Sequence, residues 1–217
     1  MQNQLKAREK NVLNQTFNLI RTKAFEKALK LIEDFLDEGG KKSPGIVANL
    51  SYLYNAFKTP DKSKLDVYVA EVSSYLRENQ EYQITAVMEN FLSLTSSKGY
   101  ARETMELFEF LLRAAAPITV FCWINYTYAA GLLDDESKDR VSALVDSRMP
   151  KEERYFGEFP MIFGNTASLL ALRGKHDRAL HYLRLCKKWD YDNFNSLRNS
   201  KDFKSMTGLD EFQRLFE

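Results

Sequence analysis

The chain has 217 residues, of which 31 are Lys or Arg and 30 are Asp or Glu, so its formal net charge is +1. A charge this close to zero gives no overall attraction to nucleic acid or to an anionic membrane, and we expect neither as a partner. The composition is 44% hydrophobic and 28% charged with only 9 Gly and 5 Pro, which is typical of a folded chain and argues against extended disorder.

The start of the chain is polar and lacks the apolar core of a signal peptide, and no run of roughly 18 apolar residues occurs. We therefore predict a cytoplasmic protein. Cys122 and Cys186 lie 64 residues apart without a CxxC spacing. This arrangement predicts free, buried thiols, which suit a reducing compartment.

Apolar residues recur at steps of three and four along most of the chain, which is typical of amphipathic helices. No alternating stretch bounded by hairpin turns predicts a strand. The predicted helices form pairs at residues 13–20 and 25–36, 44–57 and 65–76, 84–94 and 105–112, 120–128 and 141–145, and 161–170 and 179–186. We predict that all five prolines lie between helices, where a missing N–H costs least.

The second helix of each predicted pair carries a residue near its start that should face the first helix. These residues are Ala28, Leu65, Thr104, Val141 and Ala179, at intervals of 37 to 39 residues. A nearly constant period indicates stacked helix pairs, because one pair cannot bury its apolar face alone. The predicted fold class is all-α, an α-α superhelix of about five helical hairpins plus short capping helices.

The stretch LLALRGKHDRALHYLRLC, residues 169–186, resembles the tetratricopeptide repeat. Gly174 lies at its turn, Ala179 lies early in its second helix, and Leu183 and Cys186 lie on the packing face. Residues 19–36 and 97–117 are similar. The resemblance implies a tetratricopeptide-like array over residues 1–190, followed by capping helices of the same domain at residues 191–217.

No motif of the sequence predicts catalysis. His176 and His181 are five residues apart, which places them about 140° apart around a helix, so they do not point at one ion. The chain has no phosphate-binding glycine loop, no GxSxG elbow and no HExxH motif. Carboxylates in DDESKD, residues 134–139, are predicted to form a solvated edge. We expect no enzyme, no cofactor and no metal site.

The resemblance also implies where a partner binds, because in tetratricopeptide-like superhelices the first helix of each pair lines a concave face. That face holds an extended peptide or a partner helix. The partner-binding residues implied here are Phe17, Arg21, Tyr54, Lys58, Trp123, Tyr126 and Asn165. The alternative for the aromatic residues among them is packing between hairpins. The carboxylate clamp of the family is absent, since the matching positions hold Leu13, Leu50 and Glu89.

The predicted function is a non-enzymatic scaffold or adaptor that holds a partner protein or peptide on this face. The alternative is a regulator of the same fold that responds to a small molecule or a signalling peptide. Residues 147–160 interrupt the tight hairpins. This segment either packs over the fourth and fifth pairs or presents Tyr155, Phe156 and Phe159 to a partner.

Overall fold

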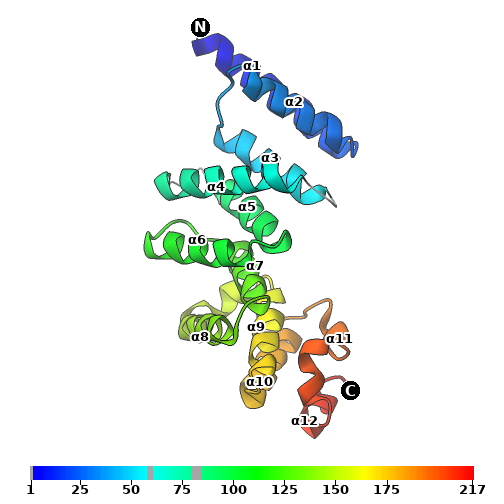
Figure 1. The fold of residues 1–217 in the computed structure, drawn as a ribbon. Coiled ribbons are helices and arrows are strands. Elements are labelled where there is room, and N and C mark those ends of the chain that lie inside the picture. The colour runs from blue at the N-terminus through cyan, green and yellow to red at the C-terminus, as the bar shows by residue number, and fades with distance from the viewer. Residues whose placement is uncertain (1, 58–60, 80–84) are drawn as a thin grey trace. The chain divides into compact units, whose positions relative to one another are not determined.

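The computed structural model of the chain describes residues 2–57, 61–79 and 85–217. All regular secondary structure in these residues is helical, which confirms the predicted all-α class. Figure 1 shows the helices in chain order. The chain divides into two compact units, Met1–Lys98 with Phe110–Pro117 and Gly99–Glu109 with Ile118–Glu217. One of the boundaries between these units, at residues 109 and 110, falls within a helix.

The first unit contains two helix pairs and one further complete helix. Its elements are α1 (Gln2–Arg21), α2 (Phe25–Asp37), α3 (Pro44–Ala56), α4 (Lys62–Glu78), α5 (Thr85–Ser97) and the end of α6 (Ala101–Arg113). Helix α1 packs along α2, and α3 packs on both α2 and α5. The apolar stripes meet in a core that includes Ile32, Phe35, Ile46, Leu53, Leu65, Leu76, Val87, Met88 and Leu92.

The second unit contains the start of α6 and the rest of the chain. Its other elements are α7 (Val120–Gly131), α8 (Asp135–Gly157), α9 (Met161–Leu172), α10 (His176–Lys188), α11 (Phe194–Leu197), the 3-10 helix η2 (Lys201–Met206) and α12 (Asp210–Arg214). Helix α9 packs on α7, α8, α10 and η2. The core includes Phe108, Cys122, Tyr126, Val141, Phe156, Phe163, Leu170, Tyr182, Leu183, Phe203 and Phe212.

The ten predicted helices correspond to α1 through α10. The five positions used to align the predicted pairs, Ala28, Leu65, Thr104, Val141 and Ala179, are all buried. In α2, α4, α6 and α10 this position is the fourth residue of the helix, whereas α8 begins about one turn earlier. The period in the sequence is therefore the distance between buried positions that are equivalent in successive helix pairs.

Two of the turns between paired helices depend on glycine. Gly99 follows α5 with a φ of 92°, and Gly174 follows α9 with a φ of 67°. This left-handed backbone ends a helix at little cost only when no Cβ is present. Lys23 has the same function after α1 with a φ of 57°, which explains why the first turn has no glycine signal in the sequence.

Several buried hydroxyl groups are satisfied within their own helix. Ser51, Thr95, Thr104 and Thr166 are buried, and each donates a hydrogen bond to the carbonyl oxygen four residues earlier. The donor–acceptor distances are 2.8 to 3.1 Å. A buried hydroxyl that bonds its own helix needs no polar partner from the next one, so these small side chains allow close helix packing.

One prediction about the prolines is wrong. Pro150 does not end the second helix of the fourth pair but lies inside α8, which continues to Gly157. The apolar residues Val145, Met149 and Phe156 keep helical spacing across it and are buried. Pro150 itself is exposed, and it lacks the N–H that would bond to the carbonyl group of Asp146. Burial of the apolar stripe therefore outweighs the local cost of the proline.

The extension of α8 also decides how residues 147–160 are arranged. Phe156 is fully buried, whereas Tyr155 and Phe159 remain 37% and 39% exposed. Phe159 contacts Phe121 of α7 with a ring-centroid distance of 4.5 Å. Both alternatives predicted for residues 147–160 therefore hold in part. Phe156 packs inside the unit, whereas Tyr155 and Phe159 stay at the surface.

The C-terminal segment after α10 packs on the last helix pair. Phe203, Met206 and Phe212 are fully buried, and η2 lies against α9. Lys187 donates to the carbonyl oxygen of Leu215 at 2.9 Å. This packing is what the predicted cap requires, because the outer face of a terminal helix pair is otherwise exposed to water.

In the described residues, no helix combines the length and apolarity needed to cross a membrane.

A fragment of residues 1–190 tests the importance of this packing. We expect it to aggregate, or to unfold at a clearly lower temperature than the full chain, because it uncovers the face of α9 that η2 covers. Gel filtration and thermal unfolding measure both effects. The control is Arg184→Ala in the full chain, which removes only an exposed ion pair with Glu211 and should change stability little. A monomeric fragment with the melting temperature of the full chain would contradict the role of a cap.

Gly157 marks a close approach between the end of α8 and the residue that follows α10. A Cβ atom at this position would lie 2.2 Å from Cδ2 of Trp189. The Trp189 indole also donates to Oε1 of Glu153 on α8 at 3.2 Å. The ring therefore lies over the glycine and is fixed there by a hydrogen bond.

Gly157→Ala should destabilise the protein by about 1 to 3 kcal/mol, because the added methyl group overlaps the Trp189 ring and forces the helices apart. The free energy of unfolding from urea titrations measures this. Gly208→Ala is the matched control, since its Cβ would meet no atom within 4 Å. Equal stabilities of the two variants would show that the close approach does not constrain the fold.

Candidate functional site

A groove of about 400 Å³ lies in the second unit, between α7, α9 and the C-terminal segment. Its lining comes from the end of α7, from one face of α9, and from α11 and the start of η2. The lining residues are Thr127, Tyr128, Gly131, Leu132, Asn165, Ser168, Leu169, Leu172, Leu197, Ser200, Lys201 and Asp202. Both long helices of the groove are first helices of their pairs, the position predicted to bind a partner.

Apolar side chains form the rim of the groove. Tyr128 and Leu132 of α7 are 49% and 55% exposed, and Leu172 of α9 is 44% exposed. Leu169 is buried at the base. Exposed apolar residues gathered around a concavity, rather than scattered singly, are typical of interaction sites.

Asn165 is the one predicted binding residue that lies in this groove. Its amide nitrogen donates to the carbonyl oxygen of Ile124 at 3.2 Å and to Oγ1 of Thr127 at 3.1 Å. These bonds orient the amide across the contact between α7 and α9. Within the described part of the chain, the side-chain oxygen of Asn165 accepts no hydrogen bond.

Three further polar side chains in the groove make no side-chain hydrogen bond or ion pair with the residues that the structure describes. They are Ser168, Lys201 and Asp202. Lys201 is exposed, and Ser168 and Asp202 are partly exposed. Together with the Asn165 oxygen, they give the groove both donors and acceptors that a ligand can use.

Trp123 and Tyr126, two other predicted binding residues of this unit, are buried in the core. The Phe108 ring lies 4.9 Å from the Trp123 ring and 4.1 Å from the Tyr126 ring between centroids. The Tyr126 hydroxyl donates to Oε1 of Glu109 at 2.9 Å, and burial, with that carboxylate, raises the pKa of Tyr126. Their side chains therefore offer no surface in this structure, which favours the alternative of packing between hairpins.

The first unit holds the remaining predicted residues. Phe17 is 57% exposed on α1, and the Arg21 guanidinium lies 5.8 Å from its ring centroid. Tyr54 is almost fully buried, 5.0 Å from the Tyr68 ring between centroids. Lys58 lies outside the described residues. Phe17 and Arg21 thus remain candidates for a surface contact, and Tyr54 lines a cavity that is open to solvent.

The prediction from the sequence missed the rim residues Tyr128, Leu132 and Leu172. On α7 it named Trp123 and Tyr126, whose positions on the helix face the core, whereas Tyr128, the same amino acid as Tyr126, is 49% exposed. A usable signal was present in α9, where residues 165, 168, 169 and 172 follow the helical spacing of a single face. That face begins with polar residues and ends with leucine, as expected for the wall of an open groove.

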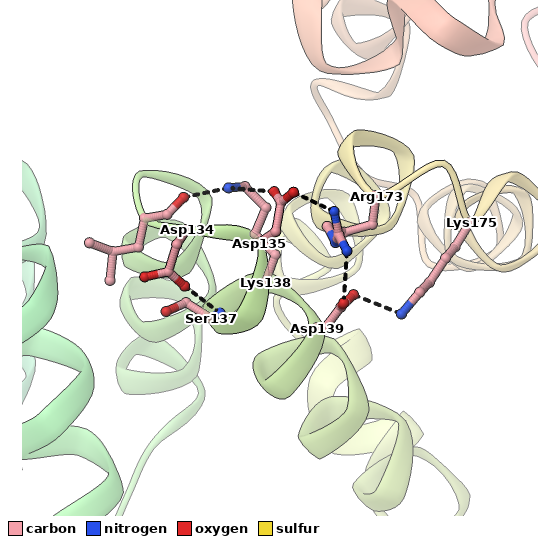
Figure 2. A network of polar contacts seen from close by, with 8 residues as sticks. Asp134, Asp135, Ser137, Lys138, Asp139, Arg173 and Lys175 are labelled. Atoms are coloured by element: carbon pink, nitrogen blue, oxygen red, sulfur yellow. Dashed lines mark hydrogen bonds and ion pairs between the residues drawn. The ribbon is translucent and has the colours of Figure 1, made fainter.

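A polar network joins the start of α8 to the turn between α9 and α10 (Figure 2). Arg173 binds the carboxylates of Asp135 and Asp139, the latter at 3.1 Å, and Lys175 binds Asp139 at 2.7 Å. Asp134 accepts from the Ser137 N–H at 2.8 Å and caps α8. The carboxylates predicted to form a solvated edge therefore also have a structural role, because two of them link the fourth pair to the fifth.

The network stabilises the charged form of Asp139. Hydrogen bonds from Arg173, and then from Lys175, lower the pKa of Asp139 from its ordinary 3.8 to about 2. Asp135 and Asp139 each face a cation. The arrangement is suited to holding two helix pairs together.

The cysteine and histidine side chains, the remaining candidates for catalysis or metal binding, take part in packing or structural contacts. Cys122 and Cys186 are buried thiols that form no disulfide, as predicted. Burial raises the pKa of Cys186 to about 12, which keeps its thiol protonated. Nε2 of His176 lies 3.2 Å from the Ser205 hydroxyl, and the His181 ring packs edge-on to Tyr182. In the described part of the chain, no three His, Cys, Asp or Glu side chains are placed to hold a metal ion.

Comparison with family models, with curated proteins and with solved structures finds no match to the chain. The tetratricopeptide-like resemblance of its repeats therefore stays a prediction.

Asp139→Asn tests the network. Because the folded pKa of Asp139 lies below its ordinary value, its ionisation stabilises the folded state above about pH 4, and this contribution is lost as the pH falls toward 2. We expect the variant to be less stable than the wild type at pH 7 by up to about 1 kcal/mol, since the ion pairs are partly exposed.

This difference should disappear as the pH is lowered from about 4 to about 2. Urea unfolding at a series of pH values measures it. Asp192→Asn, which changes an exposed carboxylate outside the network, is the control. A stability difference for Asp139→Asn that stays constant down to pH 2 would contradict the assignment.

Proposed function

We propose that the chain is a non-enzymatic protein-binding scaffold whose second unit holds an extended segment of a partner in the groove between α7, α9 and the C-terminal segment. The observation that carries the proposal is the combination of an exposed apolar rim with polar side chains that have no partner in the described structure. A partner segment covers the apolar rim and supplies hydrogen-bond partners to the polar side chains.

The polar groups of the groove favour an extended chain over a helix. A helix satisfies its own backbone N–H and C=O groups and presents only side chains. An extended segment carries backbone groups that need partners. The Asn165 oxygen can accept from a peptide N–H, and the Ser168 hydroxyl can donate to a peptide carbonyl.

The rim favours apolar side chains on that segment. Tyr128, Leu132 and Leu172 are each more than 40% exposed, and covering them releases water from apolar surface. Lys201 and Asp202 are adjacent and opposite in charge, so the groove has no net attraction for an acidic or a basic peptide. The expected ligand is therefore a segment with alternating apolar residues and little net charge, read through its backbone and its apolar side chains.

The proposal includes the finer description of the fold, an α-α superhelix of tetratricopeptide-like pairs, and a cytoplasmic location. What supports the repeat is the spacing of side-chain contacts within each unit. Asn55 binds Ser93, Thr127 binds Asn165, and Asp135 binds Arg173, in each case across 38 residues. These three separations match the period of the sequence pattern, and other contacts between neighbouring pairs span 34 to 42 residues.

The second candidate function is a regulator of the same fold that responds to a small molecule. The observation that favours it is a cavity in the first unit between α2, α3 and α4. The two candidates differ in what binds: a scaffold retains a protein at a fixed ratio during purification, whereas a regulator is stabilised by a small ligand.

Affinity purification of the chain from its native source, followed by identification of the bound proteins, tests the scaffold. The expected result is a stoichiometric partner that contains a segment able to bind alone as a synthetic peptide. Proline substitution along this peptide distinguishes the binding modes, since an extended peptide tolerates proline at several positions and a helix does not. A segment that binds only as a helix would contradict the extended mode.

Variants of the rim residues then test whether the peptide binds in the groove. Tyr128→Ala and Leu172→Ala should each weaken binding by roughly tenfold to thirtyfold, the loss expected for an apolar anchor. Phe121→Ala is the matched control, because Phe121 is an aromatic residue of the same helix, 43% exposed, that does not line the groove. Calorimetry gives the affinities. A loss caused by Phe121→Ala but not by Tyr128→Ala would move the site away from the groove.

A further inference from the structure

The first unit contains a second concave site, which is independent of the groove. This cavity of about 380 Å³ lies between α2, α3 and α4. Its lining residues are Glu33, Leu36, Lys42, Leu50, Tyr54, Ser63, Lys64, Val67, Tyr68 and Glu71. The volume is near the lower end of the range for small-molecule sites in proteins.

The walls of the cavity are mainly apolar and aromatic. Leu36 of α2 and Val67 of α4 face it from two sides, and Leu50 and Tyr54 lie one helical turn apart on α3. Val67 is 59% exposed, although most of the other β-branched residues of this unit are buried. An exposed valine beside two tyrosine rings leaves apolar surface that a ligand can cover.

The charged residues around the cavity compensate one another. Lys64 of α4 pairs with Glu33 of α2 at 3.7 Å, and Lys42 pairs with Glu71 of α4. Lys64 and Glu71 are seven residues apart, or about 10 Å along the helix. Each ionic group therefore faces an opposite charge across the cavity, and the site as a whole has no net charge.

This compensation selects the charge of a ligand. An anion or a cation has to replace one member of an ion pair and leaves the other without its counterion, whereas an uncharged molecule leaves both pairs intact. The apolar walls likewise favour a molecule that carries little polar surface.

One polar group in the cavity is open to a ligand. The Tyr54 hydroxyl makes no hydrogen bond with any described residue, although its ring is almost fully buried. The neighbouring Tyr68 hydroxyl differs, since it donates to the carbonyl oxygen of Val47 at 2.9 Å and lies 2.8 Å from the Ser51 hydroxyl. The Tyr54 oxygen is not among the buried atoms that lack a partner, so it reaches the open pocket, where it can donate to an acceptor on a ligand.

We propose that the cavity between α2, α3 and α4 binds an uncharged, largely apolar molecule about the size of one aromatic ring, with a carbonyl-type acceptor bonded to the Tyr54 hydroxyl. The ring lies against Val67, Leu36 and the tyrosines, and the two ion pairs flank it.

Three probes of the same size and different charge test this assignment: benzamide, benzoate and benzylammonium. Binding to the full chain is followed by saturation in ligand-observed and protein NMR. Benzamide should bind with a Kd on the order of 1 mM, as expected for so small a molecule. Benzoate and benzylammonium should bind at least about tenfold more weakly because each disturbs an ion pair.

Two variants locate the site. Tyr54→Phe should weaken benzamide binding about fivefold to tenfold, because it removes the donor and keeps the ring. Tyr52→Phe is the matched control, since Tyr52 lies on the same helix, is 43% exposed and does not line the cavity. Val67→Trp should abolish binding by filling the cavity. Val67 is exposed, and circular dichroism verifies that the variant folds.

The outcomes that overturn the proposal are specific. They are an absence of saturable benzamide binding up to about 10 mM, equal affinity for a charged probe, or equal effects of Tyr54→Phe and Tyr52→Phe. Retention of binding in a folded Val67→Trp variant would also overturn it. None of these results depends on peptide binding to the groove of the second unit.

Discussion

Burial of one apolar stripe per helix is the constraint on which the rest of the structure depends. A helix of about 13 residues, the length of α2, α3, α5, α6 and α10, is marginal alone in water and needs a neighbour against its apolar side. Pairing covers part of that side, and packing of first helices, as between α3 and α5 or α7 and α9, covers more. The surfaces that remain uncovered are the places where ligands are expected.

Much of the fold could be predicted from the sequence because this constraint repeats along it. The ten main helices and the five aligned buried positions follow from apolar spacing alone. Pro150 could not be placed correctly, since its local cost competes with the burial of Phe156, which depends on a distant helix.

The candidate sites were less predictable than the fold. Asn165, Trp123 and Tyr126 were all named because the resemblance implies that first helices line a groove. Asn165 lines a groove in the structure, whereas Trp123 and Tyr126 are buried, the alternative that the sequence left open for the aromatic residues. In a helix that faces the core on one side and a groove on the other, a shift of a single residue position decides which of the two a side chain faces. Tyr54 shows a third outcome, since its ring is packed while its hydroxyl faces a cavity. Its surroundings, Glu33, Lys64 and Val67, come from two other helices, so no local pattern could reveal them.

The four buried hydroxyls that bond to their own helices, on Ser51, Thr95, Thr104 and Thr166, have an evolutionary consequence. None of them relies on a polar group from a neighbouring pair for this bond. Duplication or loss of a helix pair would therefore leave these four donors satisfied. Hydroxyls bonded in this way place no hydrogen-bonding demand on a neighbouring helix pair, so these positions can be copied unchanged while the surface side chains diverge.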